Sequence, residues 1–76
     1  MSPEDRLVTL LSSWLARHLD NIELETGIEA AGREGLSPAQ AEALDELLAE
    51  LAGAGRTERG ELEMVVRETL EALVLG

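Results

Sequence analysis

The chain has 76 residues, of which 16 are Asp or Glu and 6 are Arg, so its formal net charge is -10. It contains no Lys, Cys, Phe or Tyr, and its single aromatic residue is Trp14. This length allows one small domain, and the lack of Cys excludes disulfides and thiolate metal sites. The negative charge disfavours binding to nucleic-acid phosphates and to anionic membranes.

The first residues do not have the pattern of a targeting signal. Residues 1–6 are acidic, and Thr, Ser, Arg and His interrupt the apolar stretch at 7–19. A secretory signal requires a basic start and an uninterrupted apolar run, and a transmembrane helix requires about 20 apolar residues. We therefore expect a soluble, cytoplasmic protein.

Two helix starts carry the same capping pattern. Ser2 and Ser37 each offer a hydroxyl acceptor at the N-cap, followed by Pro at the first helical position. Gln40 stands three residues after Ser37 and completes a capping box. These residues predict that one helix begins near residue 3 and another near residue 37.

Two further starts and the helix ends complete the prediction. Residues 20–23 have a looser capping box, and residues 57–58 supply Thr and Glu as the fourth start. Glycines at 32 and 35, and at 53 and 55, mark the ends of the second and third helices. We predict an all-α bundle of four to six antiparallel helices, with helices at about 3–19, 21–32, 37–53 and 57–75.

The first two predicted helices differ in apolar content. The first is apolar on more than one face, which places it in the middle of the bundle. The second is weak, because it has three large apolar residues and Gly27 in its interior. We expect Gly27 to allow close contact with Trp14 or Leu11; a helix that rearranges on binding is the alternative.

The last two predicted helices form an αα-hairpin with single apolar stripes. The stripe of the third helix contains Ala41, Leu44, Leu47, Leu48 and Leu51, and that of the fourth contains Leu62, Val65, Val66, Thr69, Leu70, Leu73 and Val74. On the third helix, Glu42, Asp45, Glu46 and Glu50 occupy the opposite side. These carboxylates form either a solvated face or a recognition surface.

Few groups are available for catalysis or cofactor binding. His18 is the only histidine, and neither Ser12 nor Ser13 shares its helical face. We interpret His18 as a partly buried capping or packing residue, with a pH sensor or a ligand as the alternative. The chain lacks Glu-x-x-His pairs, Ca²⁺ loops and phosphate-binding glycine loops. We therefore predict a non-enzymatic protein without a metal or cofactor.

One alternative is an acyl-carrier-like protein, a family that shares this length, acidity and helix content. Its phosphopantetheine is attached to a serine that opens a helix in an Asp-Ser-Leu-like motif. The corresponding residue here would be Ser37, which follows Leu36 and precedes Pro38. The N-cap role explains Ser37 fully.

A second alternative is an acidic antitoxin or immunity-type inhibitor of a basic partner. Opposite charges would steer such a protein to a cationic active site. Interfaces of this kind rely on aromatic anchors, whereas Trp14 is the only aromatic residue here.

The third possibility is a small helical adaptor. Residues 29–40 (EAAGREGLSPAQ) resemble the helix-Gly-Leu-Ser/Thr-helix junction of death-fold domains, particularly of caspase-recruitment (CARD-like) domains, and the similarity covers about residues 7–52. The resemblance implies homotypic association through oppositely charged faces and a role in assembling effectors. Bacterial members of that family stand at the N-terminus of proteases and other effectors in antiviral defence.

We therefore predict that residues 1–76 form a single interaction domain. We expect it to be the N-terminal module of a longer protein, because its last residues, 73–75, are all apolar. Its expected partner is a protein, through self-association or recruitment, and not nucleic acid or a membrane. The candidate interaction surface comprises Glu42, Asp45, Glu46 and Glu50, with Arg33, Arg56 and Arg59 near helix ends.

Overall fold

A computed structural model of the chain describes residues 2–53 and 58–76, which contain four α-helices and no strand. The all-α helical bundle expected from the sequence is thus confirmed. The helices are α1 (Pro3–Leu15), α2 (Asn21–Ala31), α3 (Pro38–Ala52) and α4 (Arg59–Leu75).

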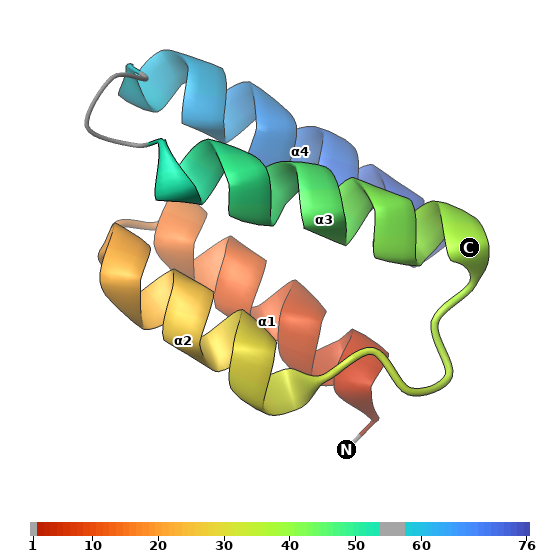
Figure 1. Cartoon of the computed structure of the whole chain (residues 1–76). Coiled ribbons are helices and arrows are strands. Elements are labelled where there is room, and N and C mark those ends of the chain that lie inside the picture. Colours follow the sequence, from red (N-terminus) through yellow and green to blue (C-terminus); the bar gives the residue numbers. More distant parts are fainter. Residues whose placement is uncertain (1, 54–57) are drawn as a thin grey trace.

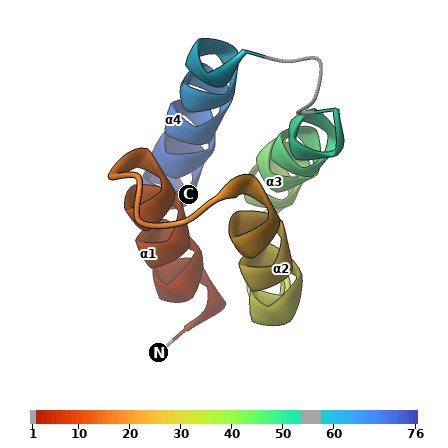
Figure 2. The ribbon, with the colours of Figure 1, turned by 90° about the vertical axis from the view of Figure 1, so that its left-hand side faces the viewer.

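The four helices lie at the corners of a square, and successive helices run antiparallel (Figures 1 and 2). The α3–α4 pair is packed most closely, followed by α1–α2 and α1–α4, whereas α2 and α3 make few contacts. Helix α1 lies diagonally opposite α3 and does not pack against it. The expectation that α1 is central was therefore wrong: its wide apolar surface faces two neighbours, α2 and α4, and its outer apolar residues are half-buried.

The predicted capping patterns start the first three helices. Ser2 Oγ accepts a hydrogen bond from the backbone N–H of Asp5 at 3.2 Å. Both bonds of a capping box are present at the start of α2, between Asp20 and Glu23. A second box joins Ser37 to Gln40 at the start of α3. Helix α4 begins after Glu58, without a side-chain cap, and Thr57 lies outside the described residues.

Helix α1 ends four residues earlier than expected, because a residue other than glycine closes it. Arg17 has a φ of 66°, in the left-handed region. The N–H of Arg17 donates to the carbonyl of Trp14, and the N–H of His18 donates to the carbonyl of Ser13. These two bonds form a Schellman motif, which usually has glycine where Arg17 stands.

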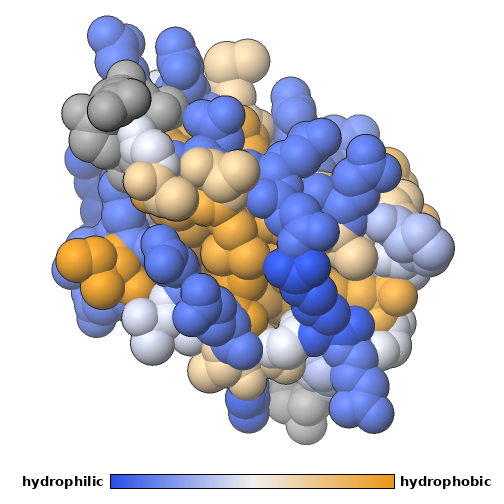
Figure 3. Space-filling model, in the orientation of Figure 1, coloured by the Kyte–Doolittle hydropathy of each residue, from blue (hydrophilic) through white to orange (hydrophobic). Residues whose placement is uncertain are grey.

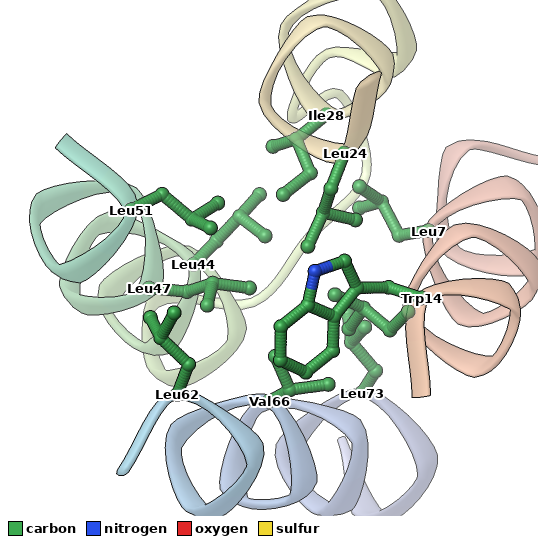
Figure 4. Packing of buried hydrophobic residues seen from close by; sticks show 11 residues of the cluster. Leu7, Trp14, Leu24, Ile28, Leu44, Leu47, Leu51, Leu62, Val66 and Leu73 are labelled. Atoms are coloured by element: carbon green, nitrogen blue, oxygen red, sulfur yellow. The ribbon is translucent and has the colours of Figure 1, made fainter. Parts of the chain in front are cut away.

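The core combines apolar side chains from all four helices (Figure 4). Trp14 is fully buried and projects from α1 between Leu24 of α2 and Val66 of α4. The other buried apolar residues are Leu7, Leu11, Ile28, Leu44, Leu47, Leu51, Leu62 and Leu73. The stripes expected for α3 and α4 thus face the core, although Ala41, Leu48, Val65 and Leu70 are half-buried and Val74 is 70% exposed.

Gly27 makes close contact with α1, as expected, but not through the expected residues. A Cβ atom at Gly27 would lie 2.7 Å from Cδ2 of Leu10. Leu10, and not Trp14 or Leu11, therefore covers Gly27. Because Gly27 has no side chain, α2 can approach the flank of α1 that carries Leu10. This contact explains part of the second apolar face of α1.

Two buried polar side chains join α3 to α4. Gln40 accepts a hydrogen bond from the N–H of Ser37 and donates one from Nε2 to the carbonyl of Leu73 at 3.1 Å. Thr69 donates to the carbonyls of Val65, at 2.8 Å, and of Ala43, at 3.4 Å. Burial of these groups is tolerated because each has a partner. They also identify the flank of α3 that faces α4.

Candidate interaction surface

The four candidate carboxylates of α3 surround its solvent-facing side. Glu42, Asp45 and Glu46 are exposed, whereas Glu50 is half-buried. With 3.6 residues per turn, Glu42 and Glu46 point away from the core, and Glu50 lies on the α4 flank. Asp45 lies on the opposite flank, toward α2. The predicted carboxylates therefore form a broad curved surface and not a single row.

Arg33 lies in the turn between α2 and α3. The N–H of Leu36 donates to the carbonyl of Arg33, and Gly35 adopts a φ of +82° at the third position of this turn. A positive φ at that position requires glycine or a similarly tolerant residue. The turn brings Arg33 into an ion pair with Asp45, and both side chains remain about half exposed. The structure thus joins two of the predicted surface residues to each other.

Arg59 has a structural role that local sequence patterns did not reveal. Its guanidinium lies over the Trp14 ring, with Cζ 4.2 Å from the ring centroid. Its Nη2 donates to the carbonyl of Trp14 at 3.0 Å, and its Nε pairs with Glu63 at 3.0 Å. A half-buried arginine with three such contacts anchors α4 to the end of α1 and offers little to a partner.

The remaining arginines do not combine into a basic surface. Arg6 is on α1, Arg17 follows the end of that helix, and Arg67 is on α4; all three are exposed. Arg56 was also expected on the interaction surface, but it lies outside the described residues. Within residues 2–53 and 58–76, the cations are therefore dispersed, whereas α3 carries four carboxylates and no Arg.

His18 is exposed, so the expectation that it is partly buried was wrong. Because α1 stops at Leu15, His18 lies in the following turn and only its backbone N–H contributes to the helix end. In the described part of the chain, no three His, Asp or Glu side chains gather where they could hold a metal ion. None of the described helices has the length and apolarity to cross a membrane.

Four large apolar side chains are well exposed in the described residues. Ile22 lies at the start of α2, Met64 on α4, and Val74 and Leu75 at the end of α4. Val74 and Leu75 lie at the opposite end of the bundle from Ile22 and Met64, so the four do not make one contiguous patch. Isolated apolar residues of this kind are normal on protein surfaces.

Comparisons with known proteins add no family assignment. No protein-family description, curated protein or solved structure matches this chain.

Proposed function

We propose that this chain is a non-enzymatic protein-interaction domain that recruits a positively charged protein partner through α3 and its surroundings. The observation that carries the proposal is that α3 presents exposed carboxylates and contains no basic residue. Glu42, Asp45 and Glu46 project from one rigid helix into solvent. Such a surface attracts a cationic partner over long distances and orients it during encounter.

The arginines favour a different protein as the partner over a second copy of this chain. Homotypic association of the CARD-like kind would join an acidic face to a basic one. Arg33 and Arg59 are both engaged within the chain, and the other described arginines lie on separate elements. The death-fold resemblance also implies about six helices, whereas the described residues contain four. Recruitment of a basic partner therefore fits the surface better than self-assembly.

Two related roles differ in what binding does to the partner. An adaptor would bring the bound partner to an effector, as in bacterial antiviral defence, whereas an antitoxin or immunity-type protein would block a basic active site. Both use the same acidic face. The acyl-carrier alternative receives no support from the structure of Ser37, because its Oγ accepts the N–H of Gln40 as a helix cap.

The test is to purify the native chain and a Glu42→Arg/Glu46→Arg variant from the source cells. The proteins that copurify with the two chains are then compared. The matched control is Glu68→Arg/Glu71→Arg, which makes the same change in net charge on exposed positions of α4. We expect the α3 variant to lose a basic copurifying protein that the α4 variant retains. Circular dichroism verifies that both variants remain helical.

Three results would contradict the proposal. The α3 variant could retain every partner, or both variants could lose the partner equally. The native chain could also sediment as a stable oligomer that the α3 reversal leaves intact. A partner bound through exposed charges must also dissociate more readily as added salt shortens the Debye length.

A further inference from the structure

The side of the bundle between α2 and α3 is the least closed part of the fold. These two helices are neighbours in the square but make far fewer contacts than the other neighbouring pairs. Figure 3 views this side and shows an apolar strip bordered by hydrophilic side chains. We call the surface between the facing flanks of α2 and α3 the α2–α3 seam.

The α3 flank of the seam is identified by Asp45. The Arg33–Asp45 pair shows that this side of α3 faces the end of α2. Residues 41, 48 and 52 share the flank with Asp45 at helical spacing. Two of them are alanines, Ala41 and Ala52, and the third is the half-buried Leu48. Small side chains on this flank leave apolar surface uncovered between the helices.

The α2 flank of the seam is identified by Gly27. Because Gly27 faces Leu10 of α1, the opposite flank of α2 faces α3. This flank carries Ile28, which is buried, and Glu25, which is half-buried. Glu29 follows on the outer side and is exposed. The accessible apolar surface of the seam therefore comes mainly from the α3 flank, and carboxylates lie along its α2 edge.

The charges around the seam specify the kind of occupant. Glu25 and Glu29 border it on α2, and Asp45 borders it on α3. Arg33 is the cation at one end, where it pairs with Asp45. An occupant must bury apolar side chains on the strip and place positive charges beside these carboxylates. An amphipathic helix with a basic polar face meets both requirements.

We propose that the α2–α3 seam binds a cationic amphipathic helix of a partner protein. The inference rests on the proposed function and specifies which part of a basic partner is recognised. The 11 residues of α2 make the seam about 16 Å long at 1.5 Å per residue, which corresponds to three turns of bound helix. The apolar face of that helix lies on Leu48, and its Lys or Arg side chains reach Glu25 and Glu29.

The experiment uses single cysteines, because the native chain has none. Ala52→Cys places a thiol on the seam, and Ala49→Cys places one on the outer face of the same helix; both positions are exposed. Each variant is labelled with an environment-sensitive fluorophore. The probe is a peptide of about 14 residues with Leu on one helical face and Lys elsewhere. A permuted peptide of identical composition, without an apolar face, is its control.

We expect the amphipathic peptide to bind at least about tenfold more tightly than the permuted one. Its binding should shift the emission of the label at Ala52→Cys to the blue and leave the label at Ala49→Cys nearly unchanged. If both peptides bind equally and only the outer label responds, the seam is not the binding site, but recognition of a cationic partner by the acidic face of α3 is still supported. If neither peptide binds, both the seam and the proposed function fail. A stable dimer whose contact alters only the seam label would make a second copy the occupant and overturn the proposal.

Discussion

The guanidinium of Arg59 covers the indole of Trp14, with 4.2 Å between Cζ and the ring centroid, and donates to the carbonyl of the same residue. At the edge of the ring, Nε1 of Trp14 donates to Oδ1 of Asn21 at 2.8 Å. Trp14 thus joins the end of α1 to the starts of both α2 and α4. This end of the bundle is held by polar contacts around one buried aromatic residue.

Replacement of Arg59 should destabilise the fold, although the residue is near the surface. Arg59→Ala removes the cation-π contact and the hydrogen bond to Trp14, so we expect a loss of about 1–2 kcal/mol in the free energy of unfolding. Arg59→Lys should lose less, because it keeps the charge but not the planar contacts. Urea denaturation followed by Trp14 fluorescence measures both. Arg67→Ala, an exposed position on the same helix, is the control; an equal effect there would contradict the role of Arg59.

Arg17→Gly should stabilise the chain. Arg17 adopts a left-handed conformation that costs an L-residue about 1 kcal/mol and that glycine adopts freely. We expect a gain of about 0.5–1 kcal/mol in the free energy of unfolding. The gain is smaller than the full cost of the left-handed conformation, because glycine also increases the entropy of the unfolded chain. Arg17→Ala makes the same change of charge without relieving the backbone and should give no gain. If both variants are equally stable, the conformation of Arg17 carries no strain.

The close approach of Gly27 to Leu10 predicts a non-additive pair. Alanine at Gly27 improves helix propensity by about 0.5–1 kcal/mol, but its Cβ meets the end of the Leu10 side chain at 2.7 Å. Gly27→Ala alone should therefore change stability little. In a Leu10→Ala background the obstruction is gone, and the same substitution should give its full gain. A double-mutant cycle by thermal and urea unfolding measures the coupling; additive effects would mean that the two residues do not meet.

Arg33 should compete with the proposed occupant of the α2–α3 seam. Arg33→Gln releases Asp45 and removes the positive charge at one end of the seam. We expect the amphipathic Leu/Lys peptide to bind about three- to tenfold more tightly to this variant. Arg67→Gln changes the net charge equally but lies on α4, so it should raise affinity much less. Isothermal titration calorimetry at low salt compares the two, and equal gains would show that only net charge matters.

Helix starts could be predicted from the sequence because caps are local. The side chains of Ser2, Asp20 and Ser37 bond to groups three residues away, so the pattern and the contact coincide in sequence. The end of α1 could not be predicted in this way, because Arg17 does the work usually done by glycine. The apolar width of α1 was also ambiguous, since it fits a central helix as well as a corner helix that faces two neighbours.

The candidate site was harder to predict than the helices. The carboxylates of α3 were identified because helical spacing places them on the outside. The pairing of Arg33 with Asp45 depends on the turn at Gly35, and the contact of Arg59 with Trp14 spans 45 residues. Neither leaves a periodic signal. The sparse α2–α3 contact likewise depends on the arrangement of the whole bundle.

The most direct test of cationic-helix recognition is an NMR titration of the uniformly ¹⁵N-labelled chain with the amphipathic Leu/Lys peptide. We expect saturable amide shifts concentrated on α2 and α3, around Glu25, Ile28 and Leu48, which weaken as salt is added. Shifts confined to the α1–α4 side of the bundle, or no saturable shifts at low salt, would contradict this expectation.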